Sequence, residues 1–177
     1  MLISHFFSWF SGKPTSGRCG YAEIPSGLPA AFDDARALEL ATDLDLHKQN
    51  ISDVELEAVA KELHHHKTRD RIQSINLSGN AITEASGRWL SMLLVDHPNL
   101  QVFDISHNQL TAEVVSDLAV SIETHPHLSE LRIGDNNLGP DGVASLAEIF
   151  QSAPRLVTLD LGWKRAHKLC LLRPVLR

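Results

Sequence analysis

A phrase that returns along the chain at a fixed interval limits its fold more than any other feature of the sequence. Asn80, Asn108 and Asn136 are separated by 28 residues each time, and a similar order of apolar and polar residues surrounds each of them. A weaker copy lies 31 residues before Asn80, with Gln49 in place of the asparagine, and a partial copy ends at Gly162. Repeats of this length stack one supersecondary unit on the next, so that neighbouring units share a continuous core.

Each copy predicts a short strand, a turn and a helix. Apolar and polar residues alternate before the asparagine, as they do in a strand with one buried face. The asparagine suits the turn, because its short amide side chain bonds backbone groups close by. Recognisable helix starts follow: Ser52 and Glu55 form a capping-box pattern, Thr83 and Thr111 occupy N-cap positions, and Gly139 precedes a proline. Apolar residues at helical spacing come after each start.

The repeat resembles the leucine-rich repeat, L-x-x-L-x-L-x-x-N-x-L, over roughly residues 41–162. Its period and full helix are similar to the ribonuclease-inhibitor type, which is also found in Ran GTPase-activating proteins, innate-immune NACHT receptors and tropomodulin-like actin regulators. The resemblance implies an α/β fold, a right-handed solenoid that forms a segment of a horseshoe. It would hold four full repeats and one partial repeat, with a parallel sheet on the concave face and helices on the convex face.

The chain is expected to contain four segments. Residues 1–22 read as a flexible, apolar and basic tail, and residues 23–43 as an N-terminal helical cap. The repeats occupy 44–162, and residues 163–177 read as an irregular basic tail. That last segment is either a short cap or unrelated sequence appended to a longer array that has been cut. The first ten residues are too few to span a bilayer, but a targeting role for them stays open.

Composition narrows the classes of function. The net charge is −6, and all 22 acidic residues lie between residues 23 and 162, which does not suggest a nucleic-acid partner. Cys19 and Cys170 are the two cysteines, too few for a disulfide framework or a four-cysteine zinc site. This favours a reducing, cytoplasmic setting. We expect no membrane partner, and the sequence leaves the oligomeric state open.

No group of residues predicts catalysis, a cofactor or a metal ion. His64, His65 and His66 are adjacent, so on a helix they point in three directions and cannot share one metal at good geometry. The turn from Gly134 to Gly139 lacks the Gly-Lys-Ser/Thr end of a phosphate loop. We therefore expect a protein that is not an enzyme and has neither cofactor nor metal.

The strand positions that alternate away from the core are the predicted partner-binding site. Their side chains are polar, and the charged ones among them are mostly acidic, which predicts a protein partner with a basic surface. The predicted contacts are Asp45, His47, Asn76, Ser78, Asp104, Ser106, Glu130, Arg132 and Asp160, whereas Gln49, Asn80, Asn108 and Asn136 are predicted to be structural.

Two other interpretations stay open. Strand side chains that face water are polar in any case, so the same pattern also fits a solvated surface without a partner. The family resemblance also allows a regulator of a small GTPase, of the Ran-activating kind, in the form of a truncated family member. Arg132 is the one arginine on the predicted face, and no residue aligns with a functional arginine of that family.

Overall fold

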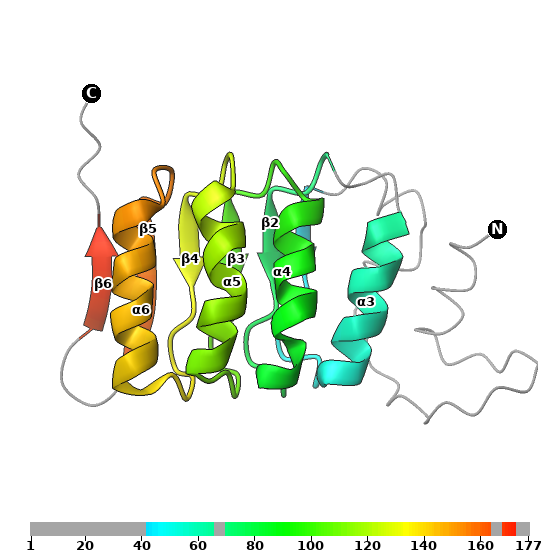
Figure 1. The fold of residues 1–177 in the computed structure, drawn as a ribbon. Coiled ribbons are helices and arrows are strands. Elements are labelled where there is room, and N and C mark those ends of the chain that lie inside the picture. The colour runs from blue at the N-terminus through cyan, green and yellow to red at the C-terminus, as the bar shows by residue number, and fades with distance from the viewer. Residues whose placement is uncertain (1–41, 66–69, 164–167, 173–177) are drawn as a thin grey trace, which may run out of the picture. The chain divides into compact units, whose positions relative to one another are not determined.

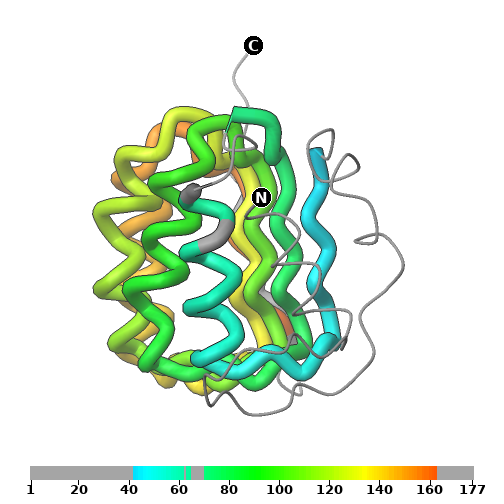
Figure 2. The backbone as a smooth tube through the Cα atoms, turned by 90° about the vertical axis from the view of Figure 1, so that its right-hand side faces the viewer, coloured from blue at the N-terminus to red at the C-terminus, as the bar shows by residue number. Residues whose placement is uncertain are grey.

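The computed structural model describes residues 42–65, 70–163 and 168–172 (Figure 1). The predicted tail 1–22 and nearly all of the predicted cap 23–43 lie outside these residues. Within the described part, one sheet of six strands is covered on one face by helices (Figure 2). In chain order the elements are β1 (Asp43–Asp45), α3 (Asp53–His65), β2 (Ser74–Asn76), the 3₁₀ turn η2 (Glu84–Ser86), α4 (Gly87–Asp96), β3 (Val102–Asp104), α5 (Ala112–Thr124), β4 (Glu130–Arg132), α6 (Gly139–Ser152), β5 (Thr158–Trp163) and β6 (Lys168–Leu172).

The first five strands are parallel and keep the chain order. The register aligns Asp45 with Asn76, Asn76 with Asp104, Asp104 with Arg132, and Arg132 with Asp160. A parallel neighbour requires a crossover, and here a helix makes it each time. The predicted α/β array of strand, turn and helix units, with a parallel sheet and one layer of helices, is therefore confirmed.

The core lies between the sheet and the helices, as the alternation of the strands predicts. The second residue of each parallel strand is at most 4% exposed, and the residues on its two sides turn to the opposite face. The predicted apolar stripe of α4 is buried as well. The apolar positions of the repeat are therefore the residues of the core, and their burial is the main favourable contribution to folding. These second residues are Leu44, Ile75, Phe103, Leu131 and Leu159.

The three repeated asparagines form a buried ladder that joins each repeat to the one before it. The Oδ1 atom of Asn80 accepts hydrogen bonds from the amides of Gln49 and Ile51, both at 3.0 Å. Its Nδ2 atom donates to the carbonyls of Leu46 and Leu77, at 2.9 and 2.8 Å. Asn108 and Asn136 make the corresponding bonds one and two repeats later. Their side-chain amides thus satisfy buried backbone groups of two repeats at once and join neighbouring repeats.

The helix starts differ in detail from the predicted caps. At α3 the Glu55 carboxylate accepts from the Ser52 amide at 2.9 Å, as in a capping box, but the Ser52 hydroxyl also bonds this carboxylate instead of a helix amide. Thr83 caps the 3₁₀ turn η2, with its hydroxyl accepting from Ala85 N at 3.3 Å, and α4 begins only afterwards. Thr111 precedes α5 but caps nothing with its side chain, and its buried hydroxyl finds no hydrogen-bond partner among the described residues.

Asp53 explains why the second repeat begins with a tighter turn. Its carboxylate, at the start of α3, accepts from the Thr83 amide at 2.9 Å, from the Thr83 hydroxyl at 2.7 Å and from the Ser86 hydroxyl. Burial pushes the pKa of Asp53 upward, but the hydrogen bonds from Ser86 and Thr83 outweigh it, so the pKa is lowered. The charged side chain of one repeat thus fixes the helix start of the next, a contact that the separate repeat patterns do not reveal.

The C-terminal segment departs from the prediction of an irregular tail. Lys168–Leu172 forms β6, which pairs antiparallel with β5, and β5 extends to six residues instead of three. The edge of a parallel sheet leaves a row of unpaired backbone groups. Here β6 pairs with the backbone groups of β5 and so covers the edge of the sheet. The local sequence pattern did not predict this pairing, because β6 does not belong to a repeat.

Histidine side chains connect the C-terminal ends of the helices. His125 is buried, and its Nδ1 atom accepts hydrogen bonds from the amides of His127 and Leu128, at 3.2 and 2.9 Å. Its Nε2 atom lies 3.2 Å from the carbonyl of His97 and donates to it. Because Nδ1 is an acceptor, the ring is neutral. Burial, together with the nearby His127 and His97, lowers the pKa of His125, although its carbonyl contacts act in the opposite direction.

The lowered pKa of His125 predicts a loss of stability in mild acid. Below about pH 6.5 the unfolded chain binds a proton at this histidine more readily than the folded chain does. The free energy of unfolding should therefore fall by up to about 1.4 kcal/mol per pH unit until the lower folded pKa is reached, with no such change above pH 6.5. Urea unfolding of the wild type and His125→Asn, between neutral pH and pH 5, measures this contribution. The two stability curves should converge as the pH falls, and parallel curves would contradict the assignment.

Candidate functional site

The face of the sheet that is turned away from the helices is the candidate site, and we call it the open sheet face (Figure 2). It is formed by the outer residues of β1 to β5 and the turns that follow them. Asp45 and Arg132 are exposed there, whereas Asn76, Glu130 and Asp160 are half-buried. The register places one residue of each parallel strand in a row across the sheet, and we call Asp45, Asn76, Asp104, Arg132 and Asp160 the central row.

Four of the five central-row side chains hold the turn at the end of their own strand. The Oδ1 atom of Asp104 accepts from the amide and the hydroxyl of Ser106, at 3.0 and 2.6 Å. Asn76 makes the same pair of bonds to Ser78, at 3.0 and 2.7 Å. Asp45 and Asp160 accept from the amides of His47 and Gly162, at 3.2 and 2.9 Å. An aspartate or asparagine is suited to this role because its side-chain oxygen reaches the amide two residues ahead.

Arg132 is the exception in the central row and forms an ionic cluster with two acidic residues. Its Nε atom donates to Glu130 Oε1 at 2.7 Å, and its Nη1 atom lies 3.5 Å from Asp104 Oδ2. The hydrogen bond to Glu130 raises the pKa of Arg132 above its already high ordinary value, with Asp104 adding to the effect. Asp104 is only 8% exposed under this cover. The arginine of the next strand therefore lies across Asp104, which was predicted as a partner contact.

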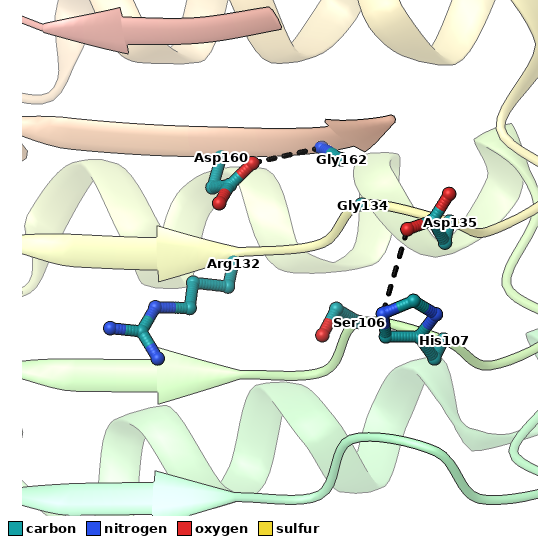
Figure 3. A pocket seen from close by; sticks show the side chains of 7 residues that line it. All are labelled: Ser106, His107, Arg132, Gly134, Asp135, Asp160 and Gly162. Carbon is teal, nitrogen blue, oxygen red and sulfur yellow. Dashed lines mark hydrogen bonds and ion pairs between the residues drawn. The ribbon is translucent and has the colours of Figure 1, made fainter. Parts of the chain in front are cut away.

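A shallow hollow of about 290 Å³ lies beside this cluster, where β4 and β5 end (Figure 3). Two glycines meet in its lining and let the backbones of the two repeats approach closely. A Cβ atom on Gly134 would come 2.2 Å from Gly162 N, and one on Gly162 would come 2.6 Å from Asp135 N. Gly162 also has a φ of +73°, which favours glycine. The lining residues are Ser106, His107, Arg132, Gly134, Asp135, Asp160 and Gly162.

Sequence reasoning identified Ser106, Arg132 and Asp160 but missed the rest of the hollow. The available signal was the residue two places after the central row, which is His47, Ser78 or Ser106 in the first three repeats and glycine in the last two. Asp135 and His107, whose Oδ2 and Nε2 atoms are 3.5 Å apart, follow in the turns. The structure does not bring all predicted residues together, since Asp45 and His47 pair at the opposite end of the sheet, with 2.8 Å between Oδ1 and Nδ1.

The described residues contain no group of three or more His, Cys, Asp or Glu side chains that could hold a metal ion. His64 instead contacts the next helix, with 2.6 Å between its Nδ1 atom and Asp96 Oδ2, and His66 lies outside the described residues. Within the same part of the chain, no helix combines the length and apolar character needed to cross a bilayer.

Comparisons with known proteins agree with this geometry. Two leucine-rich-repeat family models match, over residues 99–120 and 124–147. Among solved structures, the actin-binding site 2 of leiomodin-1 is similar, with a TM-score of 0.60 and 12% identity over 75% of this chain and 79% of that one. The C-terminal domain of tropomodulin from Caenorhabditis elegans is similar with a TM-score of 0.59 and 19% identity, over 75% of this chain and 81% of that one. Comparison with curated protein sequences gives no match. At these identities the structural likeness concerns the fold.

Proposed function

Because this chain is a leucine-rich-repeat protein of the ribonuclease-inhibitor-like type, we propose that it is a non-enzymatic interaction module that binds a protein partner through the open sheet face. One observation carries the proposal. Five parallel strands present a regular row of polar side chains, and most of these are already held in place by bonds to their own turns. A surface fixed in this way loses little side-chain freedom when a partner binds.

The charge of the open sheet face favours a basic partner. Asp43, Asp45, Asp160 and the carboxylates around Arg132 give it an acidic excess, since one arginine faces two acidic neighbours in that cluster. Acidic charge of this kind speeds the encounter with a basic surface and disfavours acidic ones. Leiomodin-1, whose similar region is named as an actin-binding site, supports a protein as the partner class, and actin is one partner to test.

Site-specific photo-crosslinking can decide which face binds. A photo-reactive residue at Ser74 reports on the open sheet face, and the same residue at Ser116 reports on the exposed side of α5. A partner that crosslinks from position 74 but not from position 116 supports the proposal. Crosslinking from position 116 alone would place the interaction on the helices and overturn it.

Neutralising the acidic members of the central row should weaken binding without unfolding the protein. Asparagine keeps the side-chain oxygen that caps the turn, as Asn76 does naturally in the second repeat, so Asp45→Asn, Asp104→Asn and Asp160→Asn remove charge and retain the cap. Affinity for the crosslinked partner should fall about tenfold, mostly through slower association at low salt. The matched control Asn76→Asp adds a charge at an equivalent position and should strengthen binding. Unchanged association rates in both variants would contradict a basic partner.

Regulation of a small GTPase is the alternative that the family resemblance suggests, and no feature of the described residues favours it. The guanidinium of Arg132 is held by Glu130 and Asp104, whereas an arginine that stabilises transferring phosphate must reach into the partner's active site. A GTP hydrolysis assay with a panel of small GTPases tests the alternative, and we expect no acceleration.

A further inference from the structure

The acidic charge of the open sheet face is not spread evenly. At the β1 end, Asp43 and Asp45 are followed by Lys48, whose side chain lies against the turn at Gly79. In the middle, Arg132 bonds Glu130 and Asp104. The hollow at the ends of β4 and β5 is lined by the carboxylates of Asp135 and Asp160, and Arg132 is the one lysine or arginine among its described lining residues. The guanidinium of Arg132 points along β4, away from Asp135 (Figure 3).

The hollow is large enough for a side chain, and the two glycines that form its floor have no side chains that could fill it. Its volume of about 290 Å³ is far above the roughly 30 Å³ share of one water molecule in the liquid. Gly134 and Gly162 form the floor with their backbones in contact, so a side chain on either would collide with the opposite backbone before it could occupy the space. Backbone contact therefore fixes the floor of the hollow, and the side chains of the other lining residues form its walls.

We propose that this hollow receives a lysine or arginine side chain from a basic segment of the protein partner, and that Asp160 and Asp135 are the residues that select it. This inference rests on the proposed function, since it assigns the partner's chemistry at one place on the open sheet face. Complementary charge identifies the occupant. Asp160 commits one oxygen to the Gly162 amide, which leaves its second oxygen for an incoming cation.

The hollow can contribute more than an exposed ion pair does. Ion pairs on flexible surface side chains contribute little, because both partners must be ordered. Here the Asp160 side chain is already ordered by its turn, and Asp135 lies 3.5 Å from the ring of His107. A lysine ammonium or an arginine fork brings several donors to such acceptors.

The test uses the full chain, labelled with ¹⁵N, and two capped peptides of the same length. One peptide alternates lysine and serine, and the other alternates glutamate and serine. The amides of Gly134 and Gly162 lie in the floor of the hollow and report on its occupancy. We expect both glycine amides to shift with the lysine peptide and not with the glutamate peptide. The absence of any shift at these two amides with millimolar lysine peptide would overturn the proposal.

A pair of matched double variants separates the hollow from the rest of the open sheet face. Asp135→Asn with Asp160→Asn removes two charges at the hollow and keeps the local backbone, since asparagine caps the turn at 160 and tolerates the φ of +54° at 135. Asp43→Asn with Asp45→Asn removes the same charge at the β1 end. The dissociation constant of the lysine peptide should rise about tenfold in the first variant and less than about twofold in the second.

The outcomes distinguish this inference from the proposed function. Equal weakening in the two double variants would mean that the peptide follows the overall negative field, so the hollow would lose its role while binding through the open sheet face would stand. Shifts confined to amides of α4 and α5 would overturn both. If the hollow variant proves poorly folded by its amide dispersion, Asp160→Asn alone serves as the test with the same expected direction.

One competing occupant is the chain's own basic sequence after Gly162. The variant Lys164→Ser with Arg165→Ser addresses it. If the lysine peptide reaches Gly134 and Gly162 only in this variant, the occupant is the chain's own segment and the partner assignment is overturned. Equal shifts in the variant and the wild type support the partner.

Discussion

Asn108→Leu should lower the free energy of unfolding by at least about 3 kcal/mol. Leucine has a similar size but leaves the Ile82 amide without its acceptor at 3.2 Å. It also leaves the carbonyls of Leu77 and Ile105 without the amide donor that now lies 3.1 Å from each. Each buried group that loses its partner carries a desolvation penalty of about 1–3 kcal/mol. Urea unfolding followed by circular dichroism measures the change.

The control for Asn108→Leu is the exposed neighbour Gln109. Gln109→Ala should change the free energy of unfolding by less than about 0.5 kcal/mol, as surface substitutions usually do. Asn108→Asp adds a second comparison, because it keeps the acceptor for the Ile82 amide but turns an oxygen toward carbonyls that now receive hydrogen bonds. It should therefore destabilise as well. A wild-type midpoint for Asn108→Leu would contradict the ladder of repeated asparagines.

Leu90→Ala should lower the free energy of unfolding by about 2–5 kcal/mol. Leu90 is 0% exposed on α4, and α4 packs between α3 and α5, so the deleted atoms leave a cavity inside the helix layer. In a repeat array each unit is stabilised by its two neighbours, and a cavity in a central unit weakens both interfaces. Thermal and urea unfolding both measure the effect.

Val95 provides the matched control on the same helix. Its side chain is 66% exposed, so Val95→Ala removes methyl groups from the surface without creating a cavity. Its effect should stay within about 0.5 kcal/mol of zero. Equal effects of Leu90→Ala and Val95→Ala would mean that α4 is rotated about its axis relative to this structure.

The sequence by itself determined the repeat, its strands and helices, and which face of each strand is buried. These features depend on residues that are close together within one repeat, so the spacing of apolar and polar side chains predicts them. The role of Asn80, Asn108 and Asn136 was predictable for the same reason, because the same local turn recurs in each copy. Their second role, bonding the repeat before, follows once the copies are stacked at a constant register.

Only the tertiary structure decided which polar residues of the open sheet face are available to a partner. Arg132 covers Asp104 because the register places them on adjacent strands, and Asp53 fixes the start of the following helix through Thr83. The hollow arises where Gly134 and Gly162, a full repeat apart in sequence, come into backbone contact, and β6 pairs with β5 although it lies outside the repeat. Each of these is a contact between repeats or with a segment beyond them. The repeat pattern of the sequence reveals the features that every repeat shares. These contacts instead depend on residues that differ from one repeat to the next, so the pattern does not reveal them.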